Sequence, residues 1–394
     1  MVPAPTTNAP RGELSMHFAP VILTEEEKAL QSDVRNFLAK ELPKGSYRPG
    51  LGMNAEASPE FSKKLASRGW LGMVIPPAYG GHGRSAVDRF IVVEELLAAG
   101  APVGAHWIAD RQTAPTLMKF GTELQRHRFL PAIAAGECYF SIGMSEPDSG
   151  SDLASVRTTG TRVDGGWSVS GTKIWTTGAH RSHFFVALCR TSPLGADRHE
   201  GLSQLIVDLS ASGITINPIL FLDGTHDFNE VVLDDVFVPD DMVLGEVGMG
   251  WHQVTSELAY ERSGPDRLLS SWQLLKTYLA ERGEHAVDVA EPIGRLIARF
   301  FTIRQLSLSV ARALQQGQSP EVEAAIVKDL GTTFEQEVVA VMQSIVEDDP
   351  DPGSPSLFES LLAQSILVSP SYTIRGGTTE VLRSVAARDL RNTK

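Results

Sequence analysis

Cysteine and long apolar runs are scarce in this 394-residue sequence, and each absence excludes a class of protein. The two cysteines, Cys138 and Cys189, are too few for a disulfide framework or a zinc cluster, and Cys189 follows an apolar run. We therefore expect both to be reduced core residues. No run approaches the roughly 18 apolar residues that a membrane helix needs, so no membrane span is predicted.

Basic residues are also in short supply. The sequence has 35 Lys and Arg against 48 Asp and Glu, which gives a formal net charge of −13. A nucleic-acid binder normally presents a basic surface, so that class is disfavoured. Residues 1–20 are rich in Pro, Ala and Thr and lack the apolar core of a signal peptide, so we expect a flexible tail on a cytoplasmic protein. The length predicts two or three domains.

Helix signals dominate residues 21–138. Thr24 and Glu27 have the spacing of a capping box, which predicts a helix start, and Ser58 followed by Pro59 predicts another. Residues 84–100 and 110–136 carry further helical patterns. We therefore predict an N-terminal α-helical domain over residues 21–138.

The pattern changes to alternating apolar and polar residues from about residue 139. Residues 162–171 alternate around Gly165-Gly166, which is typical of a hairpin. Further strands are predicted at Phe184–Cys189, Leu202–Leu209 and Glu230–Phe237. We predict a small β domain over residues 139–248, either a barrel or a sandwich.

Residues 249–394 are predicted to form a C-terminal helical bundle, interrupted only by the Asp- and Pro-rich stretch 348–355. Helices, then strands, then helices, without βαβ alternation, exclude a Rossmann-type fold. The cluster of Gly245, Gly248 and Gly250 is therefore interpreted as a turn into a helix rather than a dinucleotide fingerprint. The predicted fold class is multidomain α+β, with a helical domain on each side of a β domain.

Two segments of the β domain carry the strongest functional signal. They are Gly143–Asp152 and Gly171–Gly178. Glycine and serine let a backbone approach a ligand and leave N–H groups pointing at it. The hydroxyls of these segments and the flat ring of Trp175 suit a large planar cofactor that carries phosphates. The alternative is a pair of Gly/Ser-rich surface turns, and either segment alone leaves both interpretations open.

Together the two segments resemble the flavin-binding signature of the acyl-CoA dehydrogenase family. The first has the family's Ser/Thr-Glu-Pro followed by Gly-Ser-Asp, and the second its Gly-x-Lys-x-Trp-x-Thr run. Residues 89–137 resemble the family's first helical domain, and residues 228–251 resemble the end of its middle domain. The resemblance covers almost the whole chain and implies a flavoprotein that binds FAD and an acyl-CoA thioester.

The resemblance also implies roles for individual residues, none of them a metal ligand. Ser145 is expected near the flavin ring, Ser151 near the CoA portion, and Thr378 at a helix start that suits an anion. The substrate-binding residues implied are Ser151, Arg262 and Gly377. The cofactor-binding residues implied are Ile142, Met144, Ser145, Gly150, Ser151, Trp175, Thr176, Thr177, Thr378, Thr379 and Glu380.

Desaturation of a thioester needs a base for the α proton, usually a carboxylate whose pKa is raised by an apolar site. Much of the family places this Glu in a C-terminal motif, but the matching position here is Gly376. A minority places it on the first helix after the β domain, where this chain has Glu261.

Helical spacing puts Glu261 on the same face as Trp251, Val254 and Leu258, and Pro265 is expected to bend this helix. We therefore predict Glu261 as the base. The alternatives are a structural ion pair at Glu261, or a contribution from the neighbouring Glu257.

Two family features are missing. Residues 286–293 lack the usual basic residue and Phe-Gly, and residues 361–367 lack the usual glycines. In homotetrameric members these segments clasp the adenine half of a neighbour's FAD. The chain is thus expected to form either a homo-oligomer or a heterotetramer with a paralogous chain. The other expected partners are an acyl-CoA or carrier-bound acyl substrate and an electron-transfer flavoprotein. A noncatalytic subunit and a flavin oxidase or monooxygenase remain alternatives.

Overall fold

The computed structural model describes residues 16–52, 55–282, 289–346 and 349–392. Its N-terminal part is helical, and Thr24 and Ser58 cap the first two helices as predicted, Thr24 in a full capping box. The α-helices of this part are α1 (Glu25–Glu41), α2 (Pro59–Ser67), α3 (Ala86–Ala99), α4 (Ala114–Phe120) and α5 (Glu123–Ala134).

The pattern predicted over residues 110–136 is not one continuous helix. A π-helical turn, η3 (Ala109–Thr113), precedes α4, and α4 ends at Phe120. Gly121 is extended, and the next residue, Thr122, forms a capping box with Gln125 that starts α5. A new cap supplies the N–H groups of α5 with partners, so the chain starts a second helix instead of continuing the first.

The β domain is one mixed eight-stranded sheet. The predicted hairpin and the three predicted strands are present, and the order along the sheet is β6-β7-β3-β2-β4-β5-β8, with β1 parallel to β4. The strands are β1 (Phe140–Gly143), β2 (Thr159–Val163), β3 (Gly166–Thr177), β4 (Phe184–Arg190), β5 (Leu202–Asp208), β6 (Ile214–Leu220), β7 (His226–Pro239) and β8 (Val243–Leu244).

The sheet does not close into a barrel, which corrects one of the two predicted architectures. Within residues 139–248, all of which are described, no ladder joins the edge strands β6 and β8. Strand β8 has only two residues and offers too little backbone to close the sheet. Strand β6 was not predicted, because Pro218 interrupts its pattern; Pro is tolerated there because β6 lies at an edge.

The C-terminal part is helical, as predicted, but has more interruptions than the sequence indicated. Helix α6 does not bend at Pro265: it ends at Glu261, and a 3₁₀ turn, η7 (Pro265–Arg267), follows. Breaks also precede α9 and α11. The helices of this part are α6 (Gly250–Glu261), α7 (Trp272–Arg282), α8 (Ala290–Gln315), α9 (Glu321–Ser344), α10 (Leu357–Val368) and α11 (Thr379–Asn392).

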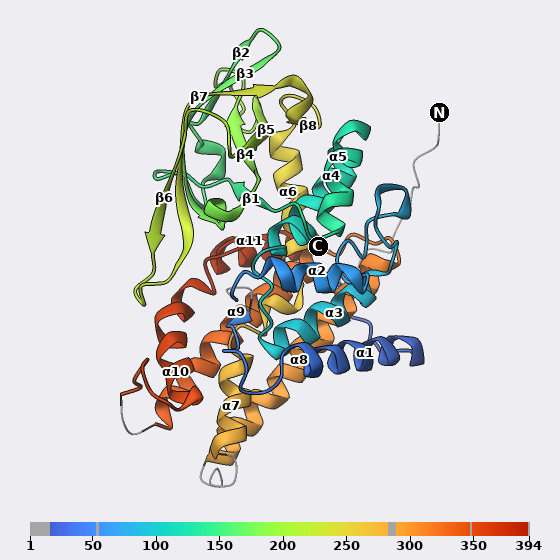
Figure 1. Ribbon diagram of the computed structural model, residues 1–394, viewed down its shortest axis with the longest axis vertical. Coiled ribbons are helices and arrows are strands. Elements are labelled where there is room, and N and C mark those ends of the chain that lie inside the picture. The colour runs from blue at the N-terminus through green and yellow to red at the C-terminus, as the bar shows by residue number, and fades with distance from the viewer. Residues whose placement is uncertain (1–15, 53–54, 283–288, 347–348, 393–394) are drawn as a thin grey trace.

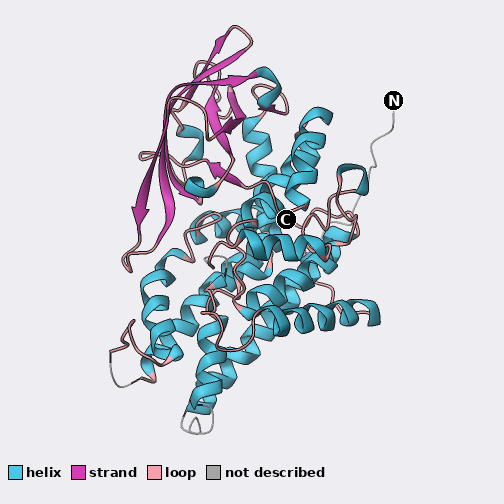
Figure 2. Cartoon of the chain, viewed as in Figure 1, coloured by secondary structure: helices cyan, strands magenta, loops and turns pink. Residues whose placement is uncertain are grey.

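The two helical parts share one hydrophobic core, while the sheet has its own. Val34 and Leu97 from the N-terminal helices pack in the same cluster as Leu274, Phe300 and Phe334 from the C-terminal helices. The strands gather at one end of the molecule and the long C-terminal helices at the other (Figures 1 and 2). Helix α5 belongs to the core of the sheet and so joins the helical part to the β domain.

Ion pairs fix α3 between α1 and α8. The Glu95 carboxylate accepts two hydrogen bonds of 2.8 Å from Arg35 on α1, and Glu94 pairs with Arg304 on α8 at 2.6 Å. Both glutamates are buried. Their partners therefore compensate charges that would be costly to leave unpaired in the interior.

Both cysteines are buried and free, as predicted. Burial raises the pKa of Cys138 to about 11 and that of Cys189 to about 12, which keeps both thiols protonated at neutral pH. Among the described residues, no helix is long and apolar enough to cross a membrane, and no cluster of His, Cys, Asp or Glu could hold a metal ion.

Candidate active site

A buried ion pair joins the two segments that carry the flavin-like signature. The Lys173 ammonium lies 2.8 Å from the Glu146 carboxylate, and their side chains are 0% and 7% exposed. Glu146 also accepts hydrogen bonds from the N–H groups of Arg157 and Thr158, at 2.6 and 2.9 Å. Lys173 comes from β3 and Glu146 from the loop after β1, so this contact positions one segment against the other.

The electrostatics of this pair follow from its burial. Burial alone would raise the pKa of Glu146, but the Lys173 ammonium and the hydrogen bonds to the carboxylate hold it below its ordinary range. Burial also lowers the pKa of Lys173, although Glu146 opposes this shift. Backbone contacts add to the junction, because the Ile174 N–H donates to the Ser145 carbonyl at 3.0 Å.

Trp175 occupies a strained position at the end of β3. Its φ is +59°, in the left-handed region that bulky residues rarely adopt, and the ladder between β3 and β7 shifts register between Lys173 and Thr176. The bulge leaves Trp175 54% exposed, in a T-shaped contact with Phe228 at 5.9 Å between ring centroids. A large aromatic face is thus held outside the core, as expected for a residue that covers a ligand.

Thr176, next along β3, is fully buried and oriented by Asn229 on β7. The Asn229 amide donates to the Thr176 carbonyl at 3.0 Å and accepts at 2.8 Å from His226. In the described part of the chain, no hydrogen bond reaches the Thr176 hydroxyl. Thr177 ends the strand and is half-buried opposite Phe228.

Met144 of the first segment and residues of helix α6 belong to one apolar cluster. Met144 and Leu153 pack with Trp251 and Val254 of α6 in a small apolar cluster. Ile142, in β1, packs against both the helical core and the core of the sheet. Gly150 and Ser151 lie in the exposed loop between β1 and η4 (Leu153–Ser155). The predicted cofactor segment and the predicted base helix therefore contribute to the same apolar cluster.

Glu261 is the last residue of α6, two turns after Val254. The side chains of residues 257–261, which include Glu257 and Leu258, lie outside the described residues. The predicted shared face is therefore described only at Trp251 and Val254, which is fully buried. The structure describes the backbone of Glu261 at the end of α6. The role of Glu261 as the base stays a prediction.

Arg262 and Gly377, both predicted to bind substrate, lie together. A Cβ built on Gly377 would be 3.6 Å from a guanidinium nitrogen of Arg262, whose side chain is buried. Gly376 and Gly377 have φ values of +67° and +93°, so the chain turns here through conformations that favour glycine. The turn thus brings the start of α11 to the end of α6.

Buried charges hold this turn in place. The Lys328 ammonium, fully buried on α9, donates to the Gly377 carbonyl at 2.6 Å. Arg375 donates to the Ser270 hydroxyl at 2.6 Å and to the Glu335 carboxylate at 3.2 Å. No local sequence pattern indicates these roles, because the partners are far apart along the chain.

The start of α11 offers fewer free N–H groups than predicted. The Thr379 N–H bonds to the Thr373 carbonyl at 3.2 Å, and the Val381 N–H bonds to the Thr378 hydroxyl at 3.4 Å. The exposed Glu380 carboxylate accepts hydrogen bonds from its own backbone N–H and from the Thr378 side chain, and these hydrogen bonds lower its pKa. The Thr379 hydroxyl is buried and has no hydrogen bond among the described residues. An anion would therefore meet Thr379 and the remaining N–H groups.

Comparison with known families agrees with this arrangement. Residues 24–137 match the profile described as "Acyl-CoA dehydrogenase, N-terminal domain", and residues 141–236 match "Acyl-CoA dehydrogenase, middle domain". FadE34, an acyl-CoA dehydrogenase of Mycobacterium tuberculosis, is 34% identical over 91% of this chain, which spans 50% of FadE34. FadE29, from the same organism, is 33% identical over 93% of this chain and 96% of its own length.

Two solved structures are similar over nearly their whole length. The steroid ACAD Tcur3481-Tcur3483 superposes with a TM-score of 0.81 at 27% identity, covering 94% of this chain and 98% of that one. The ChsE4-ChsE5 complex of Mycobacterium tuberculosis gives 0.78 at 29% identity, covering 95% and 99%. The chain therefore belongs to the acyl-CoA dehydrogenase family, a class of oxidoreductases that are flavoproteins, and the predicted α+β architecture is confirmed.

Proposed function

We propose that this chain is an FAD-dependent acyl-CoA dehydrogenase that uses Glu261 as its base. One observation carries the proposal: the signature segments, joined by Lys173 and Glu146, share an apolar cluster, through Met144, with the helix that ends at Glu261. The same helix end places Arg262 beside Gly377. The predicted cofactor segment is therefore linked, through this cluster, to the helix that carries Glu261 and leads directly to Arg262.

The residues present suit a flavin. Trp175 offers an exposed aromatic face, and a Cβ on Gly150 would meet nothing within 4 Å, which leaves room for a ligand near that backbone. The buried hydroxyls of Thr176 and Thr379 have no hydrogen bond among the described residues, so each can bond a ligand. Trp175, Thr176 and Thr177 would hold the ring, and Thr378, Thr379 and Glu380 the phosphate and adenine end. FAD, when bound, supplies the acceptor for the β hydride.

In this proposal Glu261 removes the α proton of the thioester. Helical periodicity puts Glu261 on the same face of α6 as Val254 and Trp251, which belong to an apolar cluster, and this would give the carboxylate a partly apolar neighbourhood. An apolar neighbourhood disfavours the charged carboxylate and so makes it a stronger base near neutral pH. Arg262 supplies a positive charge at the same helix end, which would stabilise negative charge that develops on the thioester oxygen.

Anaerobic mixing with acyl-CoA tests the proposal. The purified protein, reconstituted with FAD, should lose its visible flavin absorbance when a suitable acyl-CoA is added. Glu261→Gln should slow this bleaching by at least about a hundredfold, as loss of a general base does. Glu257→Gln, one helical turn earlier, is the matched control and should bleach at the wild-type rate. Equal rates for Glu261→Gln and wild type would show that the base lies elsewhere.

We further propose that the chain works in a heteromer. The proposal is based on residues 286–293 and 361–367, which lack the motifs with which the family usually clasps a neighbour's FAD. A similar structure, ChsE4-ChsE5, is a complex of two chains. A fully FAD-saturated, active homotetramer of this chain would contradict the heteromer. An electron-transfer flavoprotein as electron acceptor and a cytoplasmic location stay predictions.

The missing clasp also favours one competing function, a noncatalytic subunit. In that case Glu261→Gln would leave the turnover of the assembled complex unchanged. Flavin that is reduced by substrate and then reoxidised rapidly by air would instead indicate an oxidase or monooxygenase on this fold.

A further inference from the structure

Two histidines stack on each other beside the end of strand β3. His180 belongs to η5 (Ala179–Arg181), a 3₁₀ turn that follows β3, and His226 is the first residue of β7. Their ring centroids are 4.0 Å apart, and the ring planes differ by 28°. His180 is exposed and His226 is half-buried, so solvent reaches the pair from one side.

Both rings contact one oxygen atom of the buried Asn229 side chain. His180 Nδ1 lies 3.2 Å from Asn229 Oδ1, and His226 Nε2 lies 2.8 Å from the same oxygen. The Asn229 amide nitrogen donates to the carbonyls of Thr176 and Asp227, at 3.0 and 3.2 Å. The Asn229 side chain therefore uses both of its N–H groups and both lone pairs of its oxygen.

The chemistry of these contacts fixes where the protons lie. Backbone carbonyls only accept hydrogen bonds, so the Asn229 nitrogen must face Thr176 and its oxygen must face the histidines. That oxygen also only accepts, so His180 carries a proton on Nδ1 and His226 carries one on Nε2. Both rings satisfy this geometry while neutral. A second proton on either ring would add a positive charge to the stacked pair.

Asn229 holds the backbone next to the strained Trp175. Thr176 and Asn229 lie opposite each other on the β3–β7 ladder, directly after its register shift. The φ of Trp175 is +59°, a conformation that persists only where the surroundings impose it. The Gly178 N–H donates to the Asp227 carbonyl at 2.8 Å and adds a second contact to β7. The end of β3, where the flavin ring is predicted to lie, is thus fixed from β7.

The charges around the histidine pair have partners of their own. Arg181, next to His180, forms an ion pair with Asp227, and its guanidinium lies 3.5 Å from His180 Nε2. Strand β6, which packs against η5 and β7 and is fully described, carries no charged residue. A protonated His180 would therefore face the Arg181 cation. The other charged residues of β3, β5 and the start of β7 are paired as follows: Lys173 with Glu146, Asp208 with Ser210, and Glu230 with Asn217 of β6.

We propose that Asn229, held by His180 and His226, positions the end of β3 for FAD, so that protonation of the histidine pair in acid weakens FAD binding. The inference rests on the proposed function, in which Trp175 and Thr176 contact the flavin ring. It assigns Asn229 and both histidines as positioning residues, which act on the cofactor through the backbone of Thr176. The buried Thr176 hydroxyl, which has no hydrogen bond among the described residues, moves with that backbone.

The sign of the pH effect follows from the surroundings of His180. Burial, the neighbouring His226 and the Arg181 guanidinium lower the pKa of His180 below its ordinary value. The protonated ring is therefore disfavoured in the intact network, which is the form that binds FAD. The contribution of the network is full above about pH 6.5 and is lost as the pH falls from there. One proton limits the loss of FAD affinity to about tenfold per pH unit.

FAD titrations of the protein in its native assembly, at pH 7.5 and pH 5.5, test the proposal. Wild type should bind FAD more weakly at pH 5.5, by up to about tenfold. His180→Phe keeps a ring but has no N–H for Asn229, so it should bind about threefold more weakly at pH 7.5 and lose most of the pH dependence. Asn229→Asp cannot donate to the Thr176 carbonyl and should weaken binding about tenfold or more. Asn217→Ala, on the neighbouring strand β6, is the matched control and should behave like wild type.

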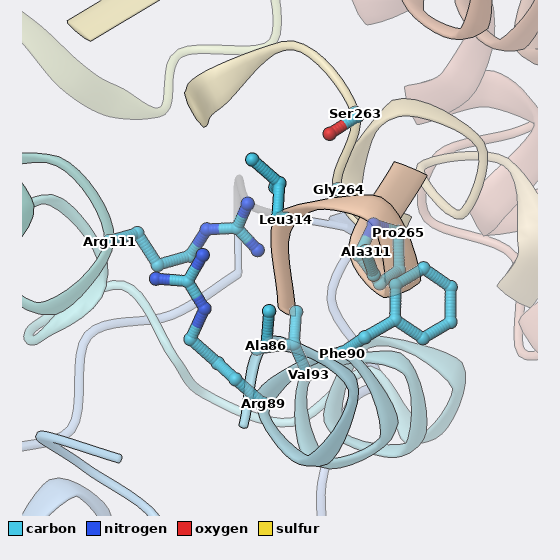
Figure 3. A pocket seen from close by; sticks show the side chains of 10 residues that line it. All are labelled: Ala86, Arg89, Phe90, Val93, Arg111, Ser263, Gly264, Pro265, Ala311 and Leu314. Carbon is cyan, nitrogen blue, oxygen red and sulfur yellow. The ribbon is translucent and has the colours of Figure 1, made fainter. Parts of the chain in front are cut away.

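Two further measurements separate positioning from a general loss of stability. At saturating FAD, His180→Phe should show shifted flavin absorption bands, because the contacts of Trp175 and Thr176 with the ring change. In the flavin-free protein, amide hydrogen exchange should become faster at residues 174–178 of this variant and stay unchanged in β4. Leu314 of α8 lines a small pocket between α3, η3 and the turn after α6 (Figure 3). Leu314→Ala should lower the melting temperature and leave the FAD affinity and the flavin spectrum unchanged.

Two outcomes would overturn the proposal. One is wild-type FAD affinity in His180→Phe at pH 7.5; because His180 is exposed, this variant should fold even if Asn229→Asp does not. The other is an FAD affinity that does not change with pH in wild type, or that changes equally in wild type and His180→Phe. A wild-type assembly that binds no FAD would contradict the proposed function instead. Hydrogen exchange of the flavin-free protein would then still show whether His180 and Asn229 hold the end of β3.

Discussion

The Lys173 ammonium lies 2.8 Å from the Glu146 carboxylate, and both groups are buried between the two signature segments of the β domain. The neighbouring residues Ser145 and Ile174 are hydrogen-bonded through their backbones, so a second contact joins the same two segments. It explains why the Lys and the Glu occur together in the two segments. Each compensates the other's buried charge, and together they set the distance between the segments.

Removal of one partner of this pair should be far more harmful than removal of both. Lys173→Met leaves the Glu146 carboxylate buried without its cation and should cost about 3 to 5 kcal/mol of stability. The double variant Lys173→Met with Glu146→Gln should recover much of that loss, since no charge remains uncompensated. Thermal unfolding and the FAD content of each variant measure both effects. A double variant as unstable as the single one would show that the charge pair is not the cause.

Trp175 should matter for the cofactor and not for the fold. Trp175→Gly removes a mostly exposed ring and a positive-φ strain of about 1 to 3 kcal/mol, so the flavin-free protein should be no less stable than wild type. The affinity for FAD should fall, because the aromatic face is lost. Phe237→Ala is the control: Phe237 is 53% exposed, near the opposite end of the β3–β7 ladder. Fluorescence titration with FAD measures the affinity of each variant. Equal FAD affinity for Trp175→Gly and wild type would show that Trp175 does not contact the cofactor.

Gly377 should not tolerate a side chain. Gly377→Ala places a Cβ on a residue with φ of +93°, which should cost about 1 to 3 kcal/mol, and the Cβ would also contact Arg262. We expect a lower melting temperature and a raised KM for acyl-CoA. Gly317→Ala, also at positive φ but with open space around its Cβ, separates the two effects: it should lower stability and leave KM unchanged. A normal KM for Gly377→Ala would place the substrate elsewhere.

His106 should make the protein sensitive to acid. It is buried, its Nδ1 lies 2.8 Å from the Ser62 hydroxyl, and burial lowers its pKa to about 3. Because the unfolded chain binds this proton near pH 6.5 and the folded one does not, the contribution of His106 to stability is full above pH 6.5. It falls by up to about 1.4 kcal/mol per unit as the pH drops from 6.5 toward 3.

Melting curves at pH 7.5 and pH 5.5 measure this effect. His106→Gln should be less stable at pH 7.5, because the packing of the ring is lost, but should lose less on acidification than wild type. His82→Gln, at an exposed histidine, should keep the wild-type pH dependence. If His106→Gln and wild type lose the same stability on acidification, His106 is not the group responsible for the acid sensitivity.

Local sequence signals predicted most of the elements. The capping boxes at Thr24 and the Ser58-Pro59 start, the hairpin at Gly165-Gly166 and the burial of Cys189 depend on near neighbours and on hydrophobicity. The helix break at Gly121 and the end of α6 at Glu261 were missed. At Gly121 the new helix cap at Thr122 outweighs helical periodicity. At Glu261 the packing of the ion cluster around Asp266 outweighs it.

The family, the order of helical and β parts, and the residue types of the candidate site could be derived from the sequence alone. These follow from short motifs whose chemistry is local: glycines and hydroxyls for a cofactor, and a carboxylate two turns from Val254 on α6. Which residues lie next to one another depends on the three-dimensional fold. Lys173 against Glu146, Arg262 against Gly377, and Arg111 against Asp266 are separated by 27, 115 and 155 positions in the printed numbering. Such pairs form because buried charges and close backbone approaches need partners that the fold, and not the neighbouring sequence, provides.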